Sequence, residues 1–242
     1  MTNKTRAVLL CGATLLAGLA LAGEGFVELF NGKDLGGWKV PAGDNGHWKV
    51  VDGVIDYDAR SEAPGDKSLW TEKEYGDFVL EVDWRLKDAP GVYPMAEILP
   101  DGSTRRDTEG KEILTERPNA DSGIFLRGST KAQVNIWCWP VGSGEVWGYR
   151  TDLSMPPEVR AGAVPKVRAD NPVGEWNHFE ITLRGKHLSV KLNGQAVIDS
   201  VELPGVPGRG PIGLQHHGGF ANGQYEGASS VIQFRNVSIQ EL

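Results

Sequence analysis

The sequence contains almost no cysteine: Cys11 and Cys138 are the only two among its 242 residues. Cys11 lies in an N-terminal apolar segment that we expect to be removed, which excludes a disulfide within the remaining chain. Stability must therefore come from a hydrophobic core. The chain also lacks basic clusters and carries a formal net charge of −7. This charge argues against nucleic acids and anionic membranes as partners.

Long hydrophobic runs are equally scarce, and the one present spans residues 7–22. It is shorter than the ~20 residues that cross a membrane. Lys4 and Arg6 precede this run, and the small-x-small pattern Ala20-Leu21-Ala22 ends it. This order of features predicts a secretory signal peptide over residues 1–22. We expect one domain over residues 23–242, secreted or periplasmic, with no membrane insertion of the mature chain.

No segment of the sequence shows helical periodicity over more than one or two turns. Most of the chain instead alternates apolar and polar residues, as in the run 48–57, which turns at Asp52-Gly53. About a dozen short strands with turns at intervals of 8 to 12 residues predict an all-β, two-sheet antiparallel sandwich of the jelly-roll type. Residues 87–120 show no period, so we expect either a lid beside a cleft or a surface insertion.

Polar side chains alternate with core side chains on several of these predicted strands. If the strands belong to one sheet, the polar sets line one concave surface; otherwise some of them form a solvated outer face. The segment 210–219 contributes an amide and an imidazole, with no side chain at Gly213 to screen them. The candidate residues are Glu81, Asp83, Arg85, Arg127, Gln133, Asn135, Trp137, Gln215 and His217, and Glu145 lies in a nearby glycine-rich loop.

Eight motifs, in order along the chain, resemble the 3-keto-disaccharide hydrolase domain, a family long described as a domain of unknown function. The motifs are LFNGKDLGGW (29–38), WKVVDGVI (48–55), DFVLEVDWR (77–85), DSGIFLRG (121–128), GEWN (174–177), LNG (192–194), GPIGLQHHG (210–218) and FRNVSI (234–239). The resemblance implies a concanavalin A-like lectin/glucanase fold, export from a bacterial cytoplasm, and action on glycosides whose glucose is oxidised at C3.

Two positions depart from the pattern of that family. The strand that commonly reads E-V-Q-I is Gln133-Val134-Asn135-Ile136 here, so an amide replaces a carboxylate. A frequent aspartate is His216, whereas the following histidine, His217, is kept. If the family uses that carboxylate as a base or metal ligand, this chain uses another acid or has altered chemistry.

A 3-keto sugar suggests roles for these residues. The carbonyl acidifies the C2 proton, so a base can remove it, the C1 substituent can leave, and water can add to the product. We expect His217 to be the base, because imidazole titrates near neutrality. Arg85 or Arg127 would stabilise the enolate, and Trp137 would stack on a sugar ring. Glu81, Asp83 and Glu145 are candidates for the proton donor or for metal ligands.

Several alternatives stay open at this point. The sequence has no HxH or HExxH pair, so a divalent cation would need ligands from separate strands. The same scaffold can also serve as a non-catalytic, lectin-like carbohydrate-binding domain, which Gln133 in place of a glutamate favours. An exported structural or adhesion domain is a third alternative. A carbohydrate is the expected ligand in the first two.

Overall fold

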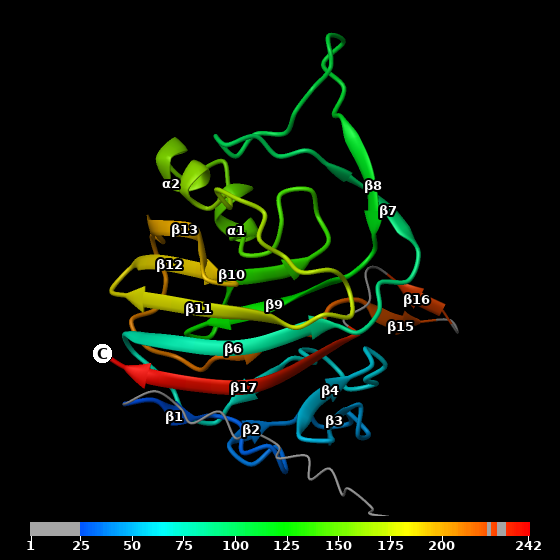
Figure 1. The fold of residues 1–242 in the computed structure, drawn as a ribbon, viewed down its shortest axis with the longest axis vertical. Coiled ribbons are helices and arrows are strands. Elements are labelled where there is room, and N and C mark those ends of the chain that lie inside the picture. The colour runs from blue at the N-terminus through cyan, green and yellow to red at the C-terminus, as the bar shows by residue number, and fades with distance from the viewer. Residues whose placement is uncertain (1–24, 222–223, 227–230) are drawn as a thin grey trace, which may run out of the picture.

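The computed structural model describes residues 25–221, 224–226 and 231–242. The predicted signal peptide lies outside the described residues. Almost all regular elements of the described chain are β-strands, and the paired strands are antiparallel. They form a two-sheet sandwich (Figure 1), which confirms the predicted fold class.

The larger sheet has eight strands, with β6 (Phe78–Leu86) and β17 (Ile232–Glu241) at its centre. The C-terminal strand β17 pairs with β6 on one side and with β4 (Val54–Tyr57) and β1 (Val27–Glu28) on the other. In spatial order the strands are β13 (Gln195–Glu202), β12 (His187–Leu192), β11 (Asn177–Arg184), β6 (Phe78–Leu86), β17 (Ile232–Glu241), β4 (Val54–Tyr57) and β3 (Trp48–Val51), with β1 (Val27–Glu28) on β17.

The smaller sheet has five strands and carries the candidate site on its outer face. Its spatial order is β10 (Ser129–Trp137), β9 (Asp121–Leu126), β14 (Gly213–Leu214), β5 (Leu69–Thr71) and β2 (Trp38–Lys39). The short strand β14 pairs with β9 on one side and with β5 on the other. This pairing brings the segment 210–219 beside residues 121–137, which are far away in sequence.

The core lies between the two sheets. Strand β6 alternates strictly, so Leu80, Val82 and Trp84 are buried while the residues between them face outward. From the smaller sheet, Val134 and Leu214 meet them with no exposed surface. Each such side chain contributes roughly 1.5–3 kcal/mol by leaving water. The core faces of β6, β10 and β14 are as the alternation predicts.

Residues 87–120 contain a hairpin that the sequence pattern did not reveal. Strands β7 (Val92–Ala96) and β8 (Leu114–Pro118) pair, and the chain between them projects from the sandwich (Figure 1). Pro94 and Pro118 hide the strand signal, since proline donates no ladder hydrogen bond. The remaining elements are the hairpin β15 (Gly219–Ala221) with β16 (Gln224–Glu226), and the helices α1 (Trp147–Arg150) and α2 (Pro157–Gly162).

Gly213 has a different role from the one its position suggested. We expected it to leave the polar face of the 210–219 segment open to a ligand. Instead, the Trp70 ring covers it, and a Cβ at Gly213 would lie only 2.7 Å from that ring. Trp70 also stacks on Phe125, with ring centroids 5.3 Å apart. The glycine is therefore needed for aromatic packing, and the open part of the site begins two residues later.

Candidate active site

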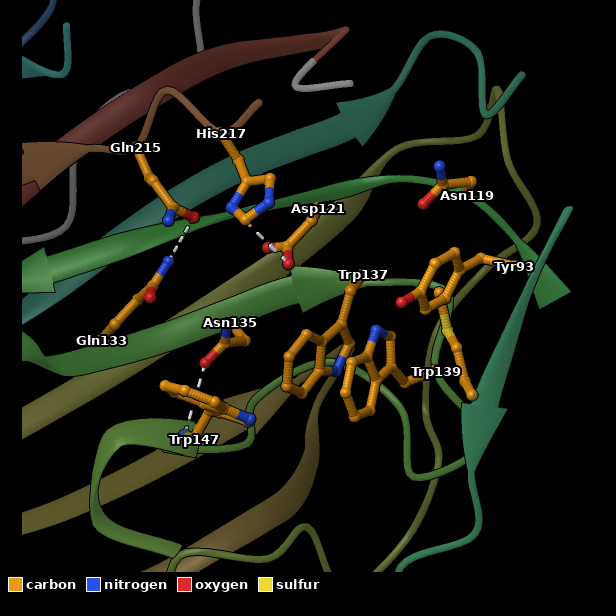
Figure 2. Close-up of a pocket in the computed structure, with 11 residues that line it drawn as sticks. Tyr93, Asn119, Asp121, Gln133, Asn135, Trp137, Trp139, Trp147, Gln215 and His217 are labelled. Carbon is orange, nitrogen blue, oxygen red and sulfur yellow. Dashed lines mark hydrogen bonds and ion pairs between the residues drawn. The ribbon is translucent and has the colours of Figure 1, made fainter. Parts of the chain in front are cut away.

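A cavity of about 510 Å³ opens on the outer face of the five-stranded sheet, beside the β7–β8 hairpin. This volume is within the range of small-molecule sites. Figure 2 shows polar groups on one side of it and stacked tryptophans on the other. Its lining consists of Tyr93, Met95, Asn119, Asp121, Gln133, Asn135, Trp137, Trp139, Trp147, Gln215 and His217.

Strand alternation positions the floor of the cavity. On β10, Val134 and Ile136 point into the core, so Gln133, Asn135 and Trp137 point outward. These three residues line the cavity together with Gln215 and His217, as the sequence predicts for their location. Their roles in chemistry stay predictions.

An aspartate and a histidine meet at one side of the cavity. Asp121 begins β9 opposite Trp137, and His217 follows β14, so the pairing of β9 with β14 brings them together. The His217 Nδ1 atom lies 3.8 Å from Asp121 Oδ2 (Figure 2). The exposed fraction of the side chain is 37% for His217 and 15% for Asp121.

Burial shifts the pKa of both partners in opposite senses. It lowers the pKa of His217 below 6.5, because an imidazolium loses hydration there. It raises the pKa of Asp121 to about 7, first through desolvation and then through the nearby Glu145 carboxylate. Near neutral pH the cavity thus holds a neutral imidazole, which can accept a proton, beside a carboxyl group that is partly protonated.

Two glutamines form a polar bridge at the same end. Gln133 Nε2 donates to Gln215 Oε1, and it lies 3.5 Å from the Ser122 carbonyl oxygen. The side chain of Gln133 lies flat across Gly123, where a Cβ would overlap it. Gln133 therefore presents its oxygen, and Gln215 its NH2 group, as the parts of the bridge that can bind a ligand.

Asn135 is held by the loop that follows β10. Its Oδ1 accepts from the Trp147 backbone N–H at 3.4 Å, and its backbone pairs with Glu145 and Gly144. The side-chain NH2 group is then the part of Asn135 that can donate to a ligand. At a site that develops negative charge on a sugar oxygen, such a donor would be stabilising.

Aromatic side chains form the other side of the cavity. Trp137 and Trp139 stack with ring centroids 4.4 Å apart and planes at 14°, and the Trp137 indole N–H donates to the Gly142 carbonyl. Trp147 is 47% exposed and Tyr93 is 53% exposed. Flat apolar surfaces of this kind suit the apolar faces of sugar rings.

Three predicted site residues lie on the other sheet. Glu81, Asp83 and Arg85 point outward from β6 in the eight-stranded sheet, so the prediction that they share one surface with His217 is wrong. Asp83 accepts from His178 at 2.8 Å, and hydrogen bonds lower its pKa despite burial. Alternation tells which side chains share a strand face, but it does not tell which sheet the strand joins.

The prediction that Arg127 stabilises an enolate is also wrong, because Arg127 is a structural residue. It is 2% exposed, and it bonds Asp77 at 2.7 Å. It also donates to backbone carbonyl groups, those of Gly76, Leu183, Gly185 and Pro207. The residue has φ +49° at the β9–β10 turn, which directs it away from the cavity toward loops of the larger sheet.

Glu145 does not line the cavity either. It is fully buried and forms an ion pair with Arg150 of α1. Desolvation raises its pKa to about 7, although Arg150 opposes this shift. Glu145 therefore influences the site indirectly, through its charge near Asp121, and its predicted role as a proton donor to substrate is wrong.

The adjacent histidines separate, as their alternation predicts. His217 lines the cavity, whereas the His216 Nδ1 atom lies 2.5 Å from the Tyr57 hydroxyl of β4. Burial lowers the pKa of His216 to about 4, so this ring is neutral at physiological pH. The His216–Tyr57 bond ties the end of β14 to the other sheet and so fixes the backbone next to His217.

Asp121 is the functional candidate that sequence reasoning missed. It opens the DSGIFLRG motif, and it shares its outward phase with Gly123 and Phe125. The alternation of that strand could have placed it beside β10, but its position as the first residue of the strand obscured the phase. Tyr93 and Trp139 were also missed, because one lies on the unrecognised hairpin and the other follows the strand end.

The described residues offer limited means of holding a metal ion. No group of three or more His, Cys, Asp or Glu side chains among them is arranged to bind one. Asp121 and His217 are the two such residues that line the cavity. Also within the described part of the chain, no helix is long and apolar enough to cross a membrane.

The 3-keto-alpha-glucoside-1,2-lyase-like domain family model matches residues 25–240. The chain belongs to this family. The match covers both sheets and the entire cavity lining, and it supports a protein that acts on carbohydrates. No curated protein matches the chain significantly.

Solved structures agree on the fold of this 3-keto-alpha-glucoside-1,2-lyase-like domain. Two crystal structures of candidate glycosyl hydrolases from Parabacteroides distasonis ATCC 8503 are similar to it. One has a TM-score of 0.57 at 22% identity, covering 90% of this chain and 84% of that one. The other has a TM-score of 0.55 at 21% identity, covering 90% and 94%.

Proposed function

We propose that this chain cleaves 3-keto-glucosides by removing the proton at C2 and eliminating the substituent at C1. The observation that carries the proposal is the Asp121–His217 pair, which places a base and an acid at one side of a sugar-sized cavity. The family to which the chain belongs, described as 1,2-lyase-like, supports the same bond. In its most general form, the proposal is that the chain cleaves glycosidic bonds.

The elimination begins at His217. Its neutral imidazole takes the C2 proton, which the neighbouring C3 carbonyl acidifies, and the electron pair of the C–H bond forms an enolate. The NH2 groups of Asn135 and Gln215 are the donors available to stabilise the enolate oxygen. The predicted arginines do not take this role, since neither Arg85 nor Arg127 lines the cavity.

The bond to the leaving group breaks in the second step. The enolate electrons form a C1=C2 double bond as the C1–O bond breaks, and Asp121 in its protonated form gives a proton to the leaving oxygen. The products are an unsaturated 3-keto sugar and an alcohol. Addition of water across C1=C2 would give net hydrolysis. The exposed rings of Trp147 and Tyr93 hold the sugar by stacking during both steps.

A lectin-like domain is the second candidate. Gln133, an amide at the position where the family resemblance implies a glutamate, and the exposed rings of Trp147 and Tyr93 can bind a sugar without chemistry. We also propose that the chain acts in the periplasm or outside the cell, because its first 22 residues have the features of a signal peptide.

The test is release of 4-nitrophenol from 4-nitrophenyl 3-keto-glucoside by the purified protein. We expect release from the keto sugar, none from the parent glucoside, and a slower rate when C2 carries deuterium. The His217→Ala variant should lose about 100-fold or more in kcat on this substrate. Asp121→Asn should lose that much on methyl 3-keto-glucoside, whose alkoxide leaving group needs a proton, and much less on the 4-nitrophenyl substrate, whose leaving group does not. The matched control is Asp83→Asn, on the other sheet, which should retain full activity.

Three outcomes would overturn parts of this proposal. Binding of the keto sugar without release would favour the lectin-like domain. A fully active His217→Ala variant would remove the proposed base, and an absent isotope effect with slow chemistry would argue against C2 proton removal. Repeating the assay with a chelator tests for a divalent ion: a rate that falls and returns with added metal would place an ion in the reaction.

A further inference from the structure

A second, smaller cavity of about 180 Å³ lies across Trp137 from the first. It occupies one end of the sandwich, where Trp84 at the end of β6, Cys138 after β10 and the loop 168–173 meet. Trp137 lines both cavities. The volume is below the usual range for drug-sized ligands, which limits an occupant to one small unit.

The lining of this cavity contains hydrogen-bond donors as well as one carboxylate, that of Asp170. Trp84 is 1% exposed, and its indole N–H finds no acceptor among the described residues. A buried donor left in this state costs free energy, so an acceptor brought by a ligand or by water would be stabilising. An indole nitrogen can only donate, which excludes a cationic ligand at this point.

The charge of the cavity also favours a ligand that is not cationic. Arg117 of β8 donates through Nε to the Cys138 carbonyl at 3.0 Å, which fixes its guanidinium at the cavity. Within the described part of the chain, no carboxylate lies within ion-pair distance of Arg117, whereas Asp170 has Arg168 at 4.0 Å and the Ser143 backbone N–H at 3.1 Å. Arg117 is thus the positive charge left without a compensating anion.

We propose that this second cavity binds the carboxylate of a small sugar acid, with Arg117 and the Trp84 indole N–H as its donors. A guanidinium suits a carboxylate because it can offer parallel N–H groups. The position beside Trp137 would let an acidic unit occupy this cavity while a neighbouring sugar occupies the first. The site binds its ligand without turnover, so it does not depend on the elimination proposed above.

The test is a titration of the ¹⁵N-labelled protein with D-glucuronate, followed through the indole N–H signals in NMR spectra. Loss of one signal in Trp84→Phe assigns Trp84. We expect that signal to shift saturably with glucuronate and not with glucose. Arg117→Ala should weaken binding about tenfold or more, since the bond lost involves two charged groups. Arg105→Ala, an exposed arginine of the same hairpin, is the matched control and should bind as the parent protein does.

The outcomes separate this site from the first cavity. Trp147→Ala should leave glucuronate binding unchanged, because Trp147 lines the first cavity alone. The proposal is wrong if the Trp84 signal does not shift, if glucose shifts it equally, or if Arg117→Ala binds as tightly as the parent. A protein that binds glucuronate but never cleaves a 3-keto-glucoside would refute the proposed function and leave this inference standing.

Discussion

Replacing Asp121 by asparagine should raise the stability of the protein, relative to the parent, between pH 5 and pH 8, while it slows turnover. Burial raises the pKa of Asp121 from 3.8 to about 7, so folding binds a proton between these two values. Stability from this group is therefore complete below pH 3.8 and is lost as the pH rises through the window up to 7. An asparagine does not titrate, so the variant lacks this loss.

The magnitude follows from the width of that window. Two pH units remain between pH 5 and the folded-state pKa of about 7, which corresponds to about 2.7 kcal/mol for a fully buried carboxyl group. The Asp121 side chain keeps 15% of its surface exposed at the cavity, so solvent screens part of the shift. We expect the free energy of unfolding of Asp121→Asn, relative to the parent, to rise by about 1–2 kcal/mol from pH 5 to pH 8.

Urea denaturation at pH 5 and at pH 8 measures this difference. Comparing variant and parent at each pH cancels the contributions of titrating groups that do not contact Asp121, including His216. The matched control is Asp199→Asn, at an exposed carboxylate of β13. This substitution should change the free energy of unfolding by the same amount at pH 5 and at pH 8. A relative stability of Asp121→Asn that does not depend on pH, or that falls from pH 5 to pH 8, would refute the reasoning.

Three further predictions concern the site and its support. The pH profile of kcat/KM should be bell-shaped, with its acid limb below pH 6.5 from His217 and its alkaline limb near pH 7 from Asp121; a single rising limb would contradict the acid role. Trp147→Ala should raise the KM up to about tenfold with kcat unchanged, because it removes a 47% exposed stacking surface; an unchanged KM would contradict this. Arg127→Met should lower the free energy of unfolding by about 3–5 kcal/mol, measured by urea denaturation, because it leaves buried carbonyl groups without a donor. The control Arg184→Met, at an exposed arginine of β11, should cost under about 1 kcal/mol, and an equal cost for both variants would contradict the structural role of Arg127.

Local patterns in the sequence were enough to place much of the fold. Side chains alternate across a strand whatever the strand pairs with, so the core positions of β6 and the cavity positions Gln133, Asn135 and Trp137 could be predicted directly. The same rule separated His216 from His217. The order of the motifs identified the family that the model match confirms.

Pairing between distant strands decided the rest of the site. Asp121 and His217 meet only because β14 lies beside β9, and Glu81, Asp83 and Arg85 are excluded only because β6 joins the other sheet. Arg127 is polar in sequence but buried among carbonyl groups in space. The identity of a strand's neighbours depends on the packing of the entire chain, which a local periodicity does not contain.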